Sequence, residues 1–165
     1  MITAVDFDGT LVQHKFPEIG EELPFAIRTL KKLQEKGHKV FLWTMRGHPN
    51  YKMFGHTVHL EDGKDSGKVI EQDTLQEALD WCKERGLEFD GVNRSPAQFS
   101  TSNKQYAALY IDDAALGCPK NQYGVDWVKV VEYLRDAGIL TTEDLFDILG
   151  IYHGHYQGNP ADLTK

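Results

Sequence analysis

A chain of 165 residues is long enough for one domain with a single hydrophobic core, and its 41% hydrophobic and 26% charged residues are typical of globular proteins. The formal net charge of −7 disfavours non-specific binding to nucleic acid, which needs clustered lysines and arginines. No stretch approaches the run of about 20 apolar residues that crosses a bilayer. We therefore expect one domain over residues 1–165, with no membrane partner and with nucleic acid disfavoured.

The two cysteines, Cys82 and Cys118, are far apart and show no metal-ligand spacing. Such sparse cysteine usage is typical of a reducing compartment. The N-terminal apolar run meets Asp6 before it could form the hydrophobic region of a signal peptide. We therefore expect a cytoplasmic location.

The first predicted element is a buried strand over Ile2–Phe7, and it ends in two acidic residues. Because side chains alternate along a strand, Asp6 and Asp8 share one side of it. Gly9 lets the backbone turn directly afterwards. Unpaired buried charge is costly, so packing does not explain this pair of carboxylates. The pair instead predicts chemistry, provided that further ligands for the same cation lie elsewhere in the chain.

The next segments alternate between loop, helix and strand. Residues Gly9–Pro24 are rich in turn formers and predict a loop. Apolar residues at helical spacing predict a helix over Glu22–Glu35, and the apolar run His38–Met45 predicts a second strand. Thr44 lies near the end of that strand, where it would face the same edge of a sheet as the acidic pair.

The segment from about residue 47 to residue 73 is too long for an ordinary connection between a strand and a helix. Two runs typical of strands, His56–Leu60 and Lys68–Glu71, flank a glycine-containing stretch over residues 61–67. This pattern predicts a small β-hairpin insertion after the second strand. A lid over the site and a surface decoration are equally compatible with it.

Helical periodicity and apolar runs predict the elements of the second half. The expected helices are Thr74–Arg85, Asp126–Ala137 and a short one that follows the capping pattern at 141–144 and ends at Gly150, and the expected strands are Leu87–Asn93 and Tyr106–Ile111. We expect the tail after residue 150 to be loosely ordered.

Strands that alternate with helices predict an α/β fold with a parallel sheet and helices on both faces, a three-layer Rossmann-like arrangement. Right-handed crossovers bring the carboxyl ends of all the strands to one edge, where ligands bind in such sheets. By this pattern Asp6, Asp8, Thr44 and Asp112 meet in one crevice.

Four short motifs occur in this order along the chain: Asp6-Phe7-Asp8-Gly9-Thr10, then Thr44, then Lys104, then Asp112-Asp113. Together they resemble the phosphatases of the haloacid dehalogenase superfamily, over roughly residues 1–118. The loop after the first strand is too short for an inserted cap domain, and so is the link between the third strand and Lys104. The resemblance is therefore to members without a large cap.

Clustered carboxylates repel one another unless a cation lies among them, and an all-oxygen ligand set suits Mg²⁺ better than zinc. The resemblance implies that Asp6 is the nucleophile that forms an aspartyl-phosphate, and that Asp8 is the general acid and base. An acid at position 8 favours phosphate esters, since a halide leaving group needs no proton. The implied metal ligands are Asp6, Asp8 through its backbone carbonyl, Asp112 and Asp113. Thr44 and Lys104 would bind the phosphoryl oxygens.

Arg46 follows the second strand, and we expect it to meet an anionic group of the substrate, with a solvated surface position as the alternative. The expected substrate is a small phosphorylated molecule. Two alternatives remain open: a phosphatase that acts on a protein or nucleic-acid end, and a non-catalytic metal-binding module, either receiver-like or a scaffold. The sequence leaves the substrate, the pathway and homo-oligomer formation open. It also leaves open a second metal at the histidines of the insertion or tail.

Overall fold

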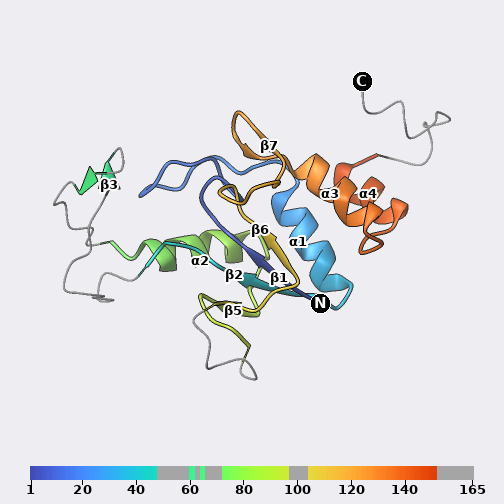
Figure 1. Cartoon of the computed structure of the whole chain (residues 1–165), viewed down its shortest axis with the longest axis horizontal. Coiled ribbons are helices and arrows are strands. Elements are labelled where there is room, and N and C mark those ends of the chain that lie inside the picture. Colours follow the sequence, from blue (N-terminus) through green and yellow to red (C-terminus); the bar gives the residue numbers. More distant parts are fainter. Residues whose placement is uncertain (48–59, 62–63, 66–71, 97–103, 152–165) are drawn as a thin grey trace.

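The computed structural model describes residues 1–47, 60–61, 64–65, 72–96 and 104–151 (Figure 1). Its centre is a four-stranded parallel sheet in the order β5-β2-β1-β6. The strands are β1 (Ile2–Val5), β2 (Lys39–Leu42), β5 (Gly91–Val92) and β6 (Leu109–Ile111). Val5 pairs with Leu42 on one side and with Ile111 on the other. The predicted Rossmann-like α/β fold is confirmed.

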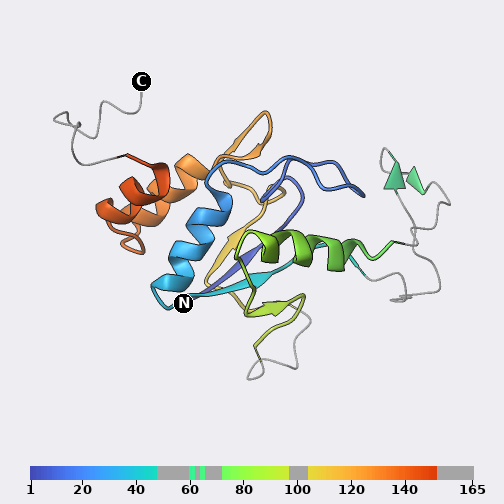
Figure 2. The same cartoon turned by 180° about the vertical axis from the view of Figure 1, so that it is seen from behind.

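Within the described residues, four helices accompany this sheet. They are α1 (Ala26–Glu35), α2 (Thr74–Glu84), α3 (Trp127–Asp136) and α4 (Thr142–Leu149). Helices α1, α3 and α4 contact one another and form a group, whereas α2 lies apart from that group beside the sheet (Figures 1 and 2).

The capping residues begin three of these helices where the sequence predicted. The Asp73 carboxylate accepts a hydrogen bond from the Gln76 N–H at the start of α2, and Asp126 caps α3 in the same way. Helix α4 has a complete capping box between Thr141 and Asp144. The sequence indicated the Thr141 cap through its capping pattern, whereas the starts of α2 and α3 were predicted from helical periodicity.

Helix α1 begins four residues later than predicted. Phe25 has a φ of 70°, in the left-handed region, so regular helix starts only at Ala26. The residues before it belong to the loop that follows β1. In that loop Leu11 and Leu23 are buried, and the Leu23 N–H donates to the Leu11 carbonyl. The predicted loop is therefore part of the core and does not only cover the strand end.

The hydrophobic core lies on one face of the sheet. Val5, Leu42 and Ile111 are paired neighbours on that face, and all four helices contribute buried residues to the same cluster. The opposite face carries Ala4 and Phe41, which do not belong to the cluster. In the part of the chain that the structure describes, the helices therefore gather on this one face of the sheet.

The order of the strands explains this arrangement of the helices. The chain steps from β1 to β2 and then to β5 in one direction, so two right-handed crossovers put α1 and α2 on the same face. The return from β5 to β6 would put its connection on the opposite face. Within its described residues, 93–96 and 104–108, that connection contains no helix.

The described strands are shorter than predicted, because the residues beyond the paired segments form the loops of the sheet edge. In the insertion, β3 (Leu60–Glu61) and β4 (Lys64–Asp65) pair antiparallel. A hairpin is therefore present, but apart from Leu60 its strands use residues that we predicted for the loop. The rest of the predicted runs, 56–59 and 68–71, and the tail after residue 151 lie outside the described residues.

A second hairpin was not predicted. It consists of β7 (Lys120–Asn121) and β8 (Gly124–Val125), directly before α3. Its segments are too short to show an alternating pattern. Within the described residues, no helix has the length and apolar character needed to cross a membrane.

Candidate active site

Polar residues, three of them predicted for the site, follow the carboxyl ends of neighbouring strands. From one side of the sheet to the other, Asn93 follows β5, Thr44 follows β2, Asp6 follows β1 and Asp112 follows β6. The Asp6 N–H donates to the Ile111 carbonyl, so β1 and β6 are still joined at the point where the acidic residues begin. The parallel sheet thus brings together residues that are more than 100 positions apart.

Three carboxylates converge at this edge. One oxygen each of Asp6, Asp112 and Asp113 lies within 4.8 Å of the others, and all three residues are half-buried. Burial raises the pKa of Asp6; the Phe7 N–H opposes the rise, while Asp112, Asp8 and Asp113 add to it, and the result is a pKa of about 7. A group of this kind fits a hard divalent cation, because the cation would offset the repulsion between the carboxylates.

Asp113 is held by its backbone. Its N–H donates to Thr10 Oγ1 at 3.0 Å, and its carbonyl accepts from Lys120 Nζ at 2.7 Å. Thr10 is itself fully buried, and its carbonyl accepts from Trp127 Nε1 at 2.7 Å. The loop after β1 therefore fixes the loop after β6, and helix α3 fixes the loop after β1.

Gly9 allows the Asp113 carboxylate to approach the backbone closely. Its φ is +76°, and a Cβ at this position would lie 2.6 Å from Asp113 Oδ2. Its carbonyl accepts a hydrogen bond from the Val125 N–H at 2.9 Å. A glycine is needed here both for the backbone conformation and for the space that the carboxylate occupies.

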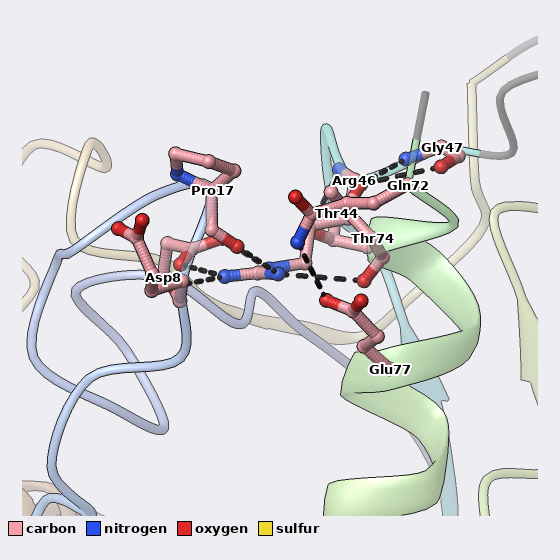
Figure 3. Close-up of polar contacts among 9 residues, drawn as sticks. Asp8, Pro17, Thr44, Arg46, Gly47, Gln72, Thr74 and Glu77 are labelled. Carbon is pink, nitrogen blue, oxygen red and sulfur yellow. Dashed lines mark hydrogen bonds and ion pairs between the residues drawn. The ribbon is translucent and has the colours of Figure 1, made fainter. Parts of the chain in front are cut away.

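Asp8 has a different environment. Its carboxylate binds the Arg46 guanidinium through two hydrogen bonds, with Arg46 Nε at 2.8 Å from Oδ2 and Nη2 at 2.7 Å from Oδ1 (Figure 3). The Arg46 side chain is fully buried, and that of Asp8 is 13% exposed. The two acids of the first motif thus have different partners, because Asp6 lies with the other carboxylates and Asp8 pairs with the Arg46 guanidinium.

The structure corrects the prediction for Arg46. Besides its two bonds to Asp8, the guanidinium donates to the carbonyls of Pro17 and Thr74 (Figure 3). It also donates to the carbonyl of Glu18. All five of its N–H groups are used within the protein, so none remains for a substrate. Neither of the expected positions, on the substrate or in solvent, matches this buried one.

Thr44 lies at the same edge of the sheet. The Thr44 N–H donates to Asn93 Oδ1 at 2.8 Å, and Thr44 Oγ1 accepts from the Arg46 N–H at 3.2 Å. The Lys104 carbonyl accepts from Ser95 Oγ, which ties the backbone of Lys104 to the segment that follows β5. The fixed orientation of the Thr44 backbone therefore depends on an asparagine that the sequence did not point to.

Comparison with known proteins agrees with this geometry. The family model described as haloacid dehalogenase-like hydrolase matches residues 3–116, which include all the predicted site residues. The chain belongs to the haloacid dehalogenase-like hydrolases. A solved structure, described as that of a conserved protein from Bacteroides thetaiotaomicron, is similar to this member at 36% identity and a TM-score of 0.58, with 88% of this chain and 97% of that chain covered. No curated protein matches.

Sequence reasoning missed the residues of this haloacid dehalogenase-like site that hold the predicted residues in place through hydrogen bonds. Thr10, Asn93 and Lys120 each support a predicted residue or its loop. Thr10 had one available signal, since it closes the first motif. Asn93 has a φ of 46°, a conformation in which asparagine is favoured, but sequence alone does not show the conformation.

Proposed function

We propose that the protein is a Mg²⁺-dependent phosphohydrolase that cleaves phosphate monoesters through an aspartyl-phosphate on Asp6. The observation that supports this most is the group of three carboxylates at the carboxyl edge of the sheet, with Asp8 beside it. A second acid with a separate partner is what a proton-transfer role needs, because it does not compete for the cation. The family membership supports a hydrolase.

The residues that would hold Mg²⁺ are Asp6, Asp112 and Asp113, together with the backbone carbonyl of Asp8. The bound ion would offset the negative charge of the carboxylates and of the phosphoryl group. Without a cation, the pKa of about 7 keeps a large fraction of Asp6 protonated at neutral pH, and a protonated carboxyl is a poor nucleophile. The donor set therefore fits the ion that the proposal requires.

The chain's own residues carry the two chemical steps. A carboxylate oxygen of Asp6 attacks phosphorus, the bond from phosphorus to the ester oxygen breaks, and Asp8 donates a proton to the leaving oxygen. Asp8 then accepts a proton from water, whose oxygen attacks the same phosphorus. The bond between phosphorus and Asp6 breaks, inorganic phosphate leaves, and both acids return to their starting states.

Thr44 and Lys104 complete the proposed site. The Thr44 hydroxyl would donate to a phosphoryl oxygen, and the Lys104 ammonium would neutralise another. We propose a small phosphorylated molecule as the substrate. Cytoplasm remains the proposed location, in line with the free thiols of Cys82 and Cys118.

Steady-state hydrolysis of p-nitrophenyl phosphate, with Mg²⁺ and with EDTA, tests the proposal on wild type and on Asp6→Asn. We expect hydrolysis by wild type only with Mg²⁺, and a loss of at least a thousandfold in the variant. Arg85→Lys, a change remote from the acids, is the matched control and should keep wild-type activity. A panel of sugar, nucleotide and peptide phosphates then identifies the substrate class. Absence of hydrolysis by wild type across the panel would refute the proposal.

A further inference from the structure

We infer that Arg46 is a positioning residue for proton transfer, because its buried guanidinium fixes the carboxyl group of Asp8 beside Asp6. This inference rests on the proposed function, in which Asp8 is the acid and base. It gives Arg46 a role in the chemical step rather than in substrate binding.

The contacts fix the plane of the Asp8 carboxyl group. Arg46 binds both oxygens, through Nε and Nη2, which is the two-point geometry that a planar guanidinium forms with a carboxylate. The guanidinium is fixed in turn by three backbone carbonyls: Pro17 at 3.1 Å, Glu18 at 2.9 Å and Thr74 at 3.4 Å. Rotation of the Asp8 side chain would break both of its bonds at once.

Burial makes this arrangement rigid. Arg46 is 1% exposed, and its Cζ lies 4.9 Å from the centre of the Phe7 ring and 5.3 Å from that of the Phe16 ring. Charge-assisted hydrogen bonds are stronger where water is excluded. Of the two side chains, only that of Asp8 is partly exposed, at 13%, so the pair is open to the site from the Asp8 end.

The two-point contact leaves Asp8 able to exchange a proton. Each carboxylate oxygen has two lone pairs, and Arg46 occupies one on each. The remaining lone pairs are available to a leaving oxygen or to water. Arg46 thus holds Asp8 in one orientation without occupying the positions that proton transfer requires, and orientation of this kind is a large part of catalytic efficiency.

The same side chain joins three segments that form the edge. Its guanidinium contacts the loop after β1 and the first residue of α2, and its own backbone N–H donates to Thr44 Oγ1. Gly47, the next residue, exchanges hydrogen bonds with Thr74 Oγ1 (Figure 3). The loop that carries the proposed phosphate-binding Thr44 is therefore tied to the group that orients Asp8.

The test is Arg46→Lys, assayed with two substrates that differ in leaving group. Lysine keeps the positive charge but cannot bind a carboxylate at two points. Proton donation matters most for a poor leaving group, so kcat/KM for phenyl phosphate should fall by about 100-fold, within the range of general acid catalysis, while kcat/KM for p-nitrophenyl phosphate falls less than tenfold. Arg85→Lys is the matched control, since Arg85 pairs with Glu22 and lies over Trp81, with no contact to Asp8.

Equal losses for both substrates would overturn the inference, and so would an unchanged kcat/KM for phenyl phosphate. Thermal unfolding shows whether the variant folds, and Arg46→Gln, which keeps one donor group without the charge, gives a second test if it does not. In an Asp8→Asn background, Arg46→Lys should add little, because the group it orients is gone. If wild type itself hydrolyses neither ester, the proposed function fails; the inference alone fails if wild type is active and the leaving-group difference is absent.

Discussion

Substitution of Gly9 by alanine should weaken Mg²⁺ binding far more than it weakens the fold. The new Cβ would lie 2.6 Å from Asp113 Oδ2 and 2.7 Å from Asp113 Cγ, ~1 Å inside an ordinary carbon contact. Rotation of the Asp113 side chain relieves this contact, but it moves the carboxylate out of the group that it forms with Asp6 and Asp112. The substitution therefore disturbs the metal ligands more than it disturbs the backbone.

The positive φ adds a separate cost that can be measured by itself. Gly37 has a φ of +78°, close to the +76° of Gly9, and a Cβ there meets nothing within 4 Å. An alanine in this conformation costs about 1–2 kcal/mol, so both variants should lose that amount of unfolding free energy. Each kcal/mol corresponds to about 2–4 °C in Tm for a chain of this size. Gly37→Ala is therefore the matched control.

The assay is thermal unfolding at increasing Mg²⁺ concentration, since a ligand that binds the folded state raises Tm according to its affinity. Without Mg²⁺ the two variants should unfold at similar temperatures. With Mg²⁺, Gly37→Ala should bind like wild type, and Gly9→Ala about 10–100-fold more weakly, the range found when metal ligands are misoriented. Wild-type affinity in Gly9→Ala would refute the assignment of Asp113 to the metal group.

Three further predictions concern protonation and the support of the site. Because ligation needs the Asp6 carboxylate and the pKa of Asp6 is about 7, Mg²⁺ affinity measured by calorimetry should fall as pH drops below 7, and a pH-independent affinity would contradict this. The metal-free protein should lose stability as pH rises from 3.8 towards 7, since folding disfavours the charged form of Asp6. Trp127→Phe removes the donor to the buried Thr10 carbonyl and should cost about 1–3 kcal/mol in urea unfolding, whereas an unchanged midpoint would show that the bond contributes nothing. Partial burial opposes ionisation of Asp144, but hydrogen bonds from Lys36 and the Thr141 cap lower its pKa to about 2. Asp144→Asn should therefore cost about 1 kcal/mol of unfolding free energy at pH 7. The difference from wild type should disappear as pH falls from 3.8 to about 2.

The sequence was informative where a structural rule acts locally or follows from strand order. The Thr141 cap acts within one helical turn, so the start of α4 could be read directly from its capping pattern. The meeting of Asp6 with Asp112 needed only the rule that parallel strands share an edge. Both inferences required no knowledge of side-chain packing.

The sequence was misleading where the outcome depends on burial. An arginine after a strand end is usually exposed, but Arg46 finds a carboxylate and three carbonyls in the interior, and those partners come from loops whose path has no sequence signature. The gathering of the described helices on one face of the sheet has a different origin. The alternation of strands and helices does not state the direction of each crossover, and that direction decides which face a helix covers.

The most direct test of the central claim is to locate the phosphoryl group during turnover. The wild-type enzyme is mixed with Mg²⁺ and a substrate from the panel, quenched in acid and treated with borohydride, which reduces an aspartyl-phosphate to homoserine, and the peptides are then sequenced by mass spectrometry. The proposal predicts homoserine at position 6, dependent on both substrate and Mg²⁺, and none at position 8 or in Asp6→Asn. Turnover with an unmodified Asp6, or with the modification at another residue, would contradict it.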